Sequence, residues 1–151
     1  MMVKGGNFSS VEAGTLDGHG TTVMIAHMIL YRPTGPKELA LVAESGWKEW
    51  PPRLPDQPIF YPVLTFDYAE KIARDWNSTR EDAGFRGYVT RFEIADSFAA
   101  RYPVELAGGA AHKELWVPAE ELAEFNRHII GKIEVVAEYR RGKRETDDSS
   151  R

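Results

Sequence analysis

The segment MILYRPTGPKELALVAESGW (residues 28–47) predicts a strand that is followed directly by a helix. Its apolar run Ile29–Tyr31 is typical of a short buried strand, which Pro33 ends. A Thr-Gly pair then precedes Pro36, and this arrangement favours a helix start because proline is harmless in the first helical turn. The helix is expected over 36–45, with its buried face at Leu39, Val42 and Ala43.

The chain beyond this segment mixes strand and helix patterns up to Arg140. Five prolines between positions 51 and 62 force an extended connection, in which only Ile59–Tyr61 can form a strand. Residues Tyr88–Ile94 alternate in polarity, as a half-buried strand does. Further strands are expected at Tyr102–Leu106, Lys113–Val117 and Ile133–Tyr139, and further helices at 66–76 and Pro118–Phe125. Because strands and helices do not alternate throughout, we predict a single α+β domain with a mixed or split β-sheet and two to three helices.

Both ends of the chain differ in composition from the middle. Residues 1–27 hold five of the 13 glycines and show no strand or helix period, which favours a flexible N-terminal arm or extension. The predicted domain therefore spans residues 28–140, and residues 141–151 form a polar C-terminal tail. On this interpretation the arm adds little to the sheet.

The composition argues against several classes of function. A chain of 151 residues suits one domain, and a formal net charge of −4 argues against nucleic-acid binding through bulk charge. The absence of cysteine excludes disulfides, thiolate metal sites and a cysteine nucleophile. Apolar stretches are too short for a membrane span and no secretion signal is recognisable, so we expect a cytoplasmic protein without membrane partners.

Motifs of the common enzyme classes are missing from the sequence. It has no glycine-rich dinucleotide loop, phosphate-binding loop, zinc-protease motif or serine-hydrolase elbow. The four histidines lack ligand spacing, so we expect no metal site.

Three polar or aromatic residues remain as candidates for chemistry. Arg32 follows an apolar strand, and Glu114 lies inside a predicted strand just after a Gly-Gly pair. Tyr61 lies in the proline-rich segment, where its ring can be presented to a ligand. Each also has an ordinary alternative: a surface ion pair for Arg32, a solvated strand edge for Glu114 and core packing for Tyr61.

The order of these segments resembles the layout of the ADP-ribosyltransferase fold, including small bacterial proteins of that kind. The resemblance runs from Leu30 to Tyr139. It is carried by LYRPTGPKELALVAESGW (30–47), IFYPVLTFDYAEKIARDW (59–76), GYVTRFEI (87–94), HKELWVPAEEL (112–122) and IIGKIEVVAEY (129–139).

This resemblance implies a role for individual residues. Arg32 matches a first-strand residue that contacts the cofactor, Tyr61 matches the central catalytic position, and Glu114 matches the catalytic acid. Further implied cofactor-binding residues are Tyr31, Tyr68 and His112, with Tyr68 an alternative for the aromatic role. The Ser-x-Ser of many members is absent here, and the residue two before Glu114 is a histidine rather than glutamine or glutamate.

The implied activity is transfer of ADP-ribose from NAD, used as a substrate without a metal, to an unknown protein, nucleic-acid or small-molecule acceptor. Breaking the nicotinamide–ribose bond develops oxocarbenium character on the sugar, which the carboxylate of Glu114 can stabilise. The forked guanidinium of Arg32 suits ribose or pyrophosphate, and Tyr61 can stack on nicotinamide.

Two alternatives stay open on the same fold. One is a non-catalytic module that binds a nucleotide or a protein, which the missing serines favour. The other is a hydrolase of NAD or another nucleotide derivative, or a small-molecule biosynthetic enzyme.

If the resemblance holds, Arg32, Tyr61 and Glu114 line one cleft although they are far apart in sequence. The arrangement of the three side chains in the folded protein checks this prediction, because unrelated surface residues have no reason to meet. A Glu114 side chain pointing away from the cleft of Arg32 would contradict it.

Overall fold

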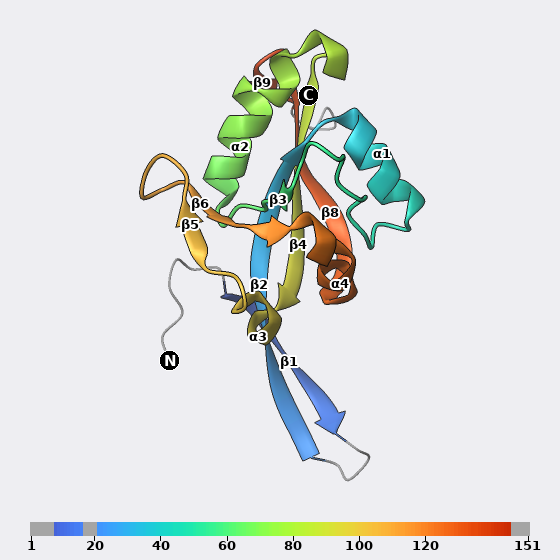
Figure 1. The fold of residues 1–151 in the computed structure, drawn as a ribbon, viewed down its shortest axis with the longest axis vertical. Helices are drawn as coiled ribbons and strands as arrows, with labels where there is room; N and C mark the ends of the chain where they lie inside the picture. Colours follow the sequence, from blue (N-terminus) through green and yellow to red (C-terminus); the bar gives the residue numbers. More distant parts are fainter. Residues whose placement is uncertain (1–7, 17–20, 146–151) are drawn as a thin grey trace, which may run out of the picture.

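The computed structural model, shown in Figure 1, describes residues 8–16 and 21–145 as a mixed α+β fold. Its main sheet has five strands in the order β1-β2-β4-β8-β9, and every neighbouring pair is antiparallel. These strands are β1 (Phe8–Leu16), β2 (Thr21–Thr34), β4 (Arg86–Ala95), β8 (Ile129–Arg140) and β9 (Lys143–Arg144). The predicted α+β class is confirmed at this level.

Two short strand pairs and four helices accompany the main sheet in the described residues. Strand β3 (Ile59–Phe60) pairs with β7 (Val117–Pro118), and β5 (Val104–Leu106) pairs with β6 (Lys113–Leu115). The helices are α1 (Pro36–Glu44), α2 (Phe66–Asp75), α3 (Asp96–Ala99) and α4 (Leu122–Arg127), with 3₁₀ turns at Asn77–Thr79, Glu81–Ala83 and Ala119–Glu121. In the view of Figure 1, α1 and α2 lie on either side of the upper parts of β2 and β4.

The core consists of two clusters of buried apolar side chains. The larger one is rich in aromatic rings, with Trp50 5.7 Å from Phe60 and 5.4 Å from Phe92 between ring centroids. The smaller one lies under α2 and includes Ala73 of that helix and Val89 of β4. Strands β4 and β8 contribute to both clusters, so the clusters adjoin along these two strands.

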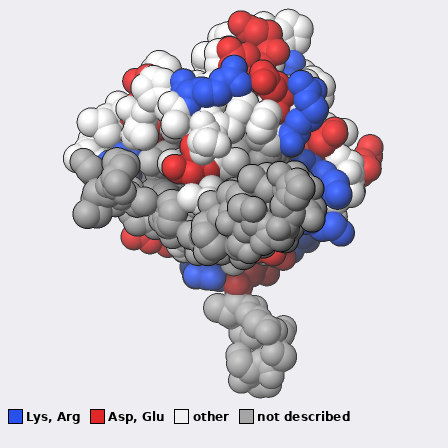
Figure 2. Space-filling view, turned by 90° about the horizontal axis from the view of Figure 1, so that it is seen from below, with Lys and Arg blue, Asp and Glu red and all other residues white. Residues whose placement is uncertain are grey.

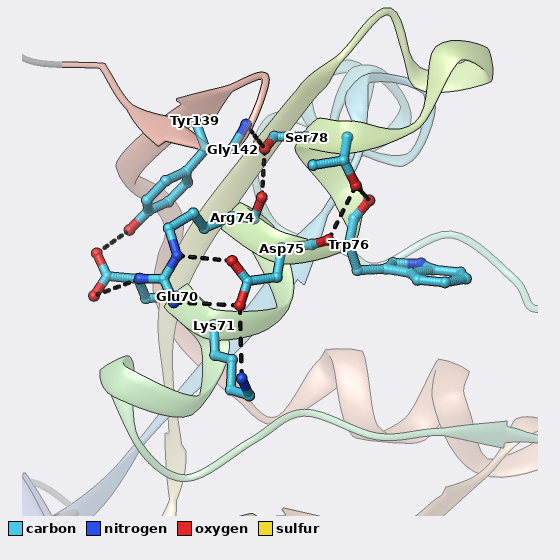
Figure 3. Close-up of polar contacts among 9 residues, drawn as sticks. Glu70, Lys71, Arg74, Asp75, Trp76, Ser78, Tyr139 and Gly142 are labelled. Carbon is cyan, nitrogen blue, oxygen red and sulfur yellow. Dashed lines mark hydrogen bonds and ion pairs between the residues drawn. The ribbon is translucent and has the colours of Figure 1, made fainter.

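Helix α2 lies against the sheet at one glycine and is tied down at its C-terminal end. A Cβ on Gly87 of β4 would be 2.5 Å from the carbonyl oxygen of Ala73, so only glycine permits this approach. Figure 3 shows the ties at the end of the helix: the Tyr139 hydroxyl donates to Glu70 at 2.6 Å, and the Ser78 hydroxyl donates to the carbonyl of Arg74 at 2.6 Å. These contacts fix the second half of α2, whose Ile72 lines the candidate site together with the following Trp76.

The prediction that residues 1–27 add little to the sheet is wrong for the residues that the structure describes. Phe8–Leu16 and the first part of β2 form an antiparallel hairpin, and β2 continues from it into the sheet, where His27 lies opposite Ala95. A two-stranded ribbon satisfies its main chain by cross-strand hydrogen bonds and needs no alternating apolar face, so composition gave no signal. Residues 1–7 and 17–20 lie outside the described residues.

Other predicted strands and helices are present, but their first or last residues differ from the prediction. The strand expected at Lys113–Val117 is split at Trp116 into β6 and β7, which pair with different partners. The strand expected at Tyr102–Leu106 begins only at Val104, and the helix expected from Pro118 starts as a 3₁₀ turn. The polar tail contributes the short β9, while residues 146–151 lie outside the described part.

Charge is not concentrated on the face drawn in Figure 2. Acidic and basic side chains lie interspersed over the described part of that face. Among the described residues, no helix combines the length and apolar character needed to cross a bilayer.

We predict that Gly87→Ala destabilises the protein by about 1–3 kcal/mol, because the added methyl group meets the backbone of α2. Gly109→Ala is the matched control, since a Cβ there has nothing within 4 Å, and its effect should stay within about 0.5 kcal/mol. Urea unfolding of the three proteins measures both changes. Equal stability of the two variants would contradict this account of how α2 is seated.

Candidate functional site

Arg32, Tyr61 and Glu114 line one cleft of about 560 Å³, as predicted. The cleft lies between the start of α1, the proline-rich loop 51–57, the end of α2 and the strand that carries Glu114. A volume of this size suits a small-molecule ligand. The three residues are brought together; their chemical roles remain predictions.

Backbone pairing at Val63 explains why the three residues meet. The Val63 N–H donates to the carbonyl of Tyr31 at 2.8 Å, and the Tyr31 N–H donates back at 2.9 Å. On its other side Val63 pairs with Glu114: Leu64 donates to the carbonyl before Glu114 and Pro62 accepts from the amide after it, both at 3.0 Å. The segment carrying Tyr61 is thus held between the strands of Arg32 and Glu114.

Arg32 is buried and bound to a carboxylate of the following helix. Its guanidinium donates from Nε and Nη2 to the two oxygens of Glu38 at 2.8 and 2.9 Å, and only 9% of the residue is exposed. The Thr34 hydroxyl donates to the same carboxylate at 2.5 Å. The Arg32 guanidinium also lies over the ring of Phe60, 4.7 Å from its centroid. The arginine is therefore part of a rigid group.

The titration of Glu38 reflects these partners. Burial acts to raise the pKa of Glu38, but the positive charge and hydrogen bonds of Arg32, the hydroxyl of Thr34 and the charge of Arg53 outweigh it and leave the pKa lowered. The ionised carboxylate of Glu38 therefore stabilises the folded protein at pH values above its lowered pKa.

Arg53 belongs to the same site and was missed in the sequence. Its side chain is 8% exposed, its Nε donates to the carbonyl of Ile59 at 3.0 Å, and Nη1 lies 3.8 Å from a Glu38 oxygen. Burial and the neighbouring charge of Arg32 lower the pKa of Arg53. The available signal was its place between the prolines of PPRLP, directly before the segment of Tyr61.

Glu114 comes from β6, which the Val63 segment separates from the strand of Arg32, and it is also held by two donors. The residue is 7% exposed, and its carboxylate accepts from the Tyr68 hydroxyl at 2.6 Å and from the Trp116 indole N–H at 2.8 Å. Burial, followed by the hydrogen bond and charge of Glu114, raises the pKa of Tyr68, which keeps its hydroxyl a donor. The carboxylate is therefore oriented before any ligand arrives.

The two aromatic candidates occupy different positions. Tyr61 is 45% exposed at the cleft, and the guanidinium of Arg53 lies 5.9 Å from its ring centroid, while the preceding Phe60 is fully buried. Tyr68 approaches the cleft only through its hydroxyl bond to Glu114. Its ring stacks on His112, with centroids 4.5 Å apart, and both line a neighbouring hollow of about 370 Å³.

Tyr31 is placed apart from both hollows. It is not among the residues lining either of them, and its ring packs edge-on against Phe66 at 6.0 Å. Its backbone contributes by pairing with Val63, whereas its side chain has a packing role. The structure thus brings Arg32, Tyr61 and Glu114 together, adds Arg53 and Glu38, and sets Tyr31 aside.

The described residues contain no group of three or more His, Asp or Glu side chains that could hold a metal ion. Three of the histidines have other contacts: His27 with Glu93, His112 with Tyr68 and His128 with Phe98. His19 lies outside the described residues.

Comparison of the chain with family models, with curated proteins and with solved structures found no match in any of the three. The resemblance to ADP-ribosyltransferases stays a prediction, and the function is argued from the cleft itself.

We predict that Glu38→Gln lowers the free energy of unfolding at pH 7 by about 1.5–3 kcal/mol, because it removes charged hydrogen bonds from a buried arginine. The pKa of Glu38 is depressed from 4.5 in the folded state, so its contribution is present above that pH and is lost as the pH falls through the folded value. Urea unfolding should therefore show a gap between the wild type and Glu38→Gln at pH 7 that narrows at lower pH.

Glu124→Gln is the control for this measurement, because Glu124 pairs with Arg101 at an exposed position. A stability gap for Glu38→Gln that does not depend on pH would contradict the assigned role of the ionised carboxylate.

Proposed function

We propose that the protein is an ADP-ribosyltransferase-like enzyme that takes NAD in this cleft and breaks its nicotinamide–ribose bond. One observation carries the proposal: the buried, doubly hydrogen-bonded carboxylate of Glu114 shares a cleft with Arg32 and Tyr61, which come from separate segments of the chain.

Cleavage of the nicotinamide–ribose bond is favoured by a fixed negative charge beside the positive charge that develops on the ribose. When the C–N bond breaks, its electron pair leaves with nicotinamide and the ribose acquires oxocarbenium character. Glu114 is the carboxylate for this task, because the hydroxyl of Tyr68 and the indole of Trp116 already set its orientation. An acceptor nucleophile then bonds to the sugar carbon and loses its proton, which completes the transfer.

The other wall of the cleft supplies binding rather than chemistry. Arg32 and Arg53 offer positive charge, and the exposed ring of Tyr61 offers a flat surface for an aromatic group of the ligand. Positive charge at one wall and a carboxylate at the other match a ligand with phosphates at one end and a reacting sugar at the other.

A non-catalytic nucleotide-binding module is the second candidate function. The pairing of Arg32 with Glu38 favours it, because two of the guanidinium donors are already engaged within the protein. Under this alternative the protein binds NAD but does not release nicotinamide from it.

We predict that Glu114→Gln leaves NAD affinity within a few-fold of the wild type, while nicotinamide release falls by about 10²–10³-fold. Glutamine keeps the size of the side chain and removes the charge that stabilises the transition state. Nicotinamide release and NAD affinity, measured side by side on the full chain, test this expectation.

Glu124→Gln is the matched control, since it removes a surface carboxylate outside the residues that line the cleft. It should leave both quantities unchanged. Wild-type protein that binds NAD without releasing nicotinamide would support the binding module, and protein that does neither would overturn both functions.

A further inference from the structure

Two arginines of the cleft share a single carboxylate partner, Glu38. Arg32 and Arg53 both lie with their side chains largely buried, and Glu38 is the carboxylate between them. Arg32 takes both oxygens of Glu38 in hydrogen bonds, whereas Arg53 approaches no closer than 3.8 Å. Glu38 therefore neutralises Arg32 first and leaves Arg53 without a full counter-charge, an arrangement that an added anion would complete.

Arg53 is held in place for such an anion. Its Nε donates to the Ile59 carbonyl, which sets the plane of the guanidinium, and the terminal nitrogens make no hydrogen bond to any described residue. The adjoining loop is stiffened by prolines and anchored by Asn126, whose carboxamide bonds both the N–H and the carbonyl of Trp50 at 2.9 Å. Little conformational entropy remains to be lost when Arg53 binds.

The surroundings of Arg53 extend the site beyond a bare anion. Lys37, in the first turn of α1, lines the same cleft and adds a second, exposed cation. Trp76 also lines it, is 58% exposed, and has the Arg80 guanidinium 4.9 Å from its ring centroid. Figure 3 shows the indole directed away from the polar contacts at the end of α2. An aromatic surface near paired cations suits a nucleotide base and its phosphates.

We infer that Arg53 binds the phosphates of a nucleoside diphosphate. As a statement about the diphosphate of NAD, the inference rests on the proposed function. Binding of phosphates by Arg53 does not itself require the nicotinamide–ribose bond to break.

The test is calorimetric titration of the full chain at low salt with three probes: ADP, inorganic pyrophosphate and adenosine. We expect ADP to bind more tightly than adenosine, and Arg53→Gln to weaken ADP binding by about tenfold or more, the loss expected for a charged hydrogen bond. Adenosine binding should change little. Arg101→Gln, at an exposed surface pair outside the residues that line the cleft, is the matched control and should bind ADP like the wild type.

Two further variants keep the inference falsifiable if Arg53→Gln does not fold, which thermal unfolding reveals. Arg53→Lys retains the charge but not the fork, so it should recover part of the lost affinity. Lys37→Gln changes an exposed residue and should weaken ADP binding by about two- to fivefold at low salt and less at high salt. Pyrophosphate that binds as ADP does would identify the phosphates as the recognised group. The inference would be overturned if neither pyrophosphate nor ADP bound, or if both bound the two Arg53 variants as tightly as they bind the wild type.

The outcomes separate this inference from the proposed function. ADP binding that depends on Arg53, in a protein that releases no nicotinamide, supports the anion site and overturns the transferase. Nicotinamide release that is unchanged in a folded Arg53→Gln, with unchanged ADP affinity, supports the transferase and overturns the anion site.

Discussion

The backbone pairing of one residue, Val63, holds the functional part of this molecule together. Its N–H and carbonyl are both engaged by Tyr31 of β2, and the residues on either side of it pair with the strand of Glu114. The residue itself is buried, so each of these hydrogen bonds is protected from water and is costly to lose. If this pairing were lost, the proline-rich segment would separate from both strands and the cleft would have no common wall.

A consequence of this pairing is a cleft whose two ends differ in charge. The arginines and Glu38 come from the strand end, the first turn of α1 and the proline-rich loop, whereas Glu114 stands on β6. Each of these charged groups is buried or half-buried and is held by hydrogen bonds from neighbouring side chains or main chain, so the field in the cleft is arranged before a ligand enters. In the function that we propose, the arginines bind the ligand and Glu114 stabilises the reacting sugar.

Two side chains, Glu38 and Tyr68, contribute both to the packing of a helix and to the geometry of the cleft. Glu38 supports the start of α1 and also sets how much of the Arg32 charge reaches the cleft. Tyr68 belongs to α2, which packs on the sheet at Gly87, and its hydroxyl orients Glu114. Changes in the packing of α2 are therefore transmitted to the carboxylate, because the helix and the site share a side chain.

The sequence predicted the local elements of the fold well where periodicity or proline chemistry was decisive. Helix α1, the amphipathic α2 and the alternating strand β4 lie where apolar spacing placed them. Strand β2 extends beyond the predicted Ile29–Tyr31 in both directions, from Thr21 through Pro33 to Thr34, so Pro33 does not end it. The N-terminal hairpin escaped detection because its two strands satisfy each other through main-chain bonds, which leave no mark on composition. The interruption of the predicted strand 113–117 at Trp116 had no sequence signal either, because it arises from the pairing of β6 with β5 and of β7 with β3.

For the site, the sequence by itself determined which residue types were present, and the resemblance in segment order only predicted that three of them would meet. Only the tertiary structure decided that Arg32 is bound to Glu38, that Arg53 joins the cleft, and that Tyr31 turns away from it. The physical reason is that these outcomes depend on long-range geometry and burial. A guanidinium finds whichever carboxylate the fold brings within hydrogen-bond distance, and no local pattern encodes that distance.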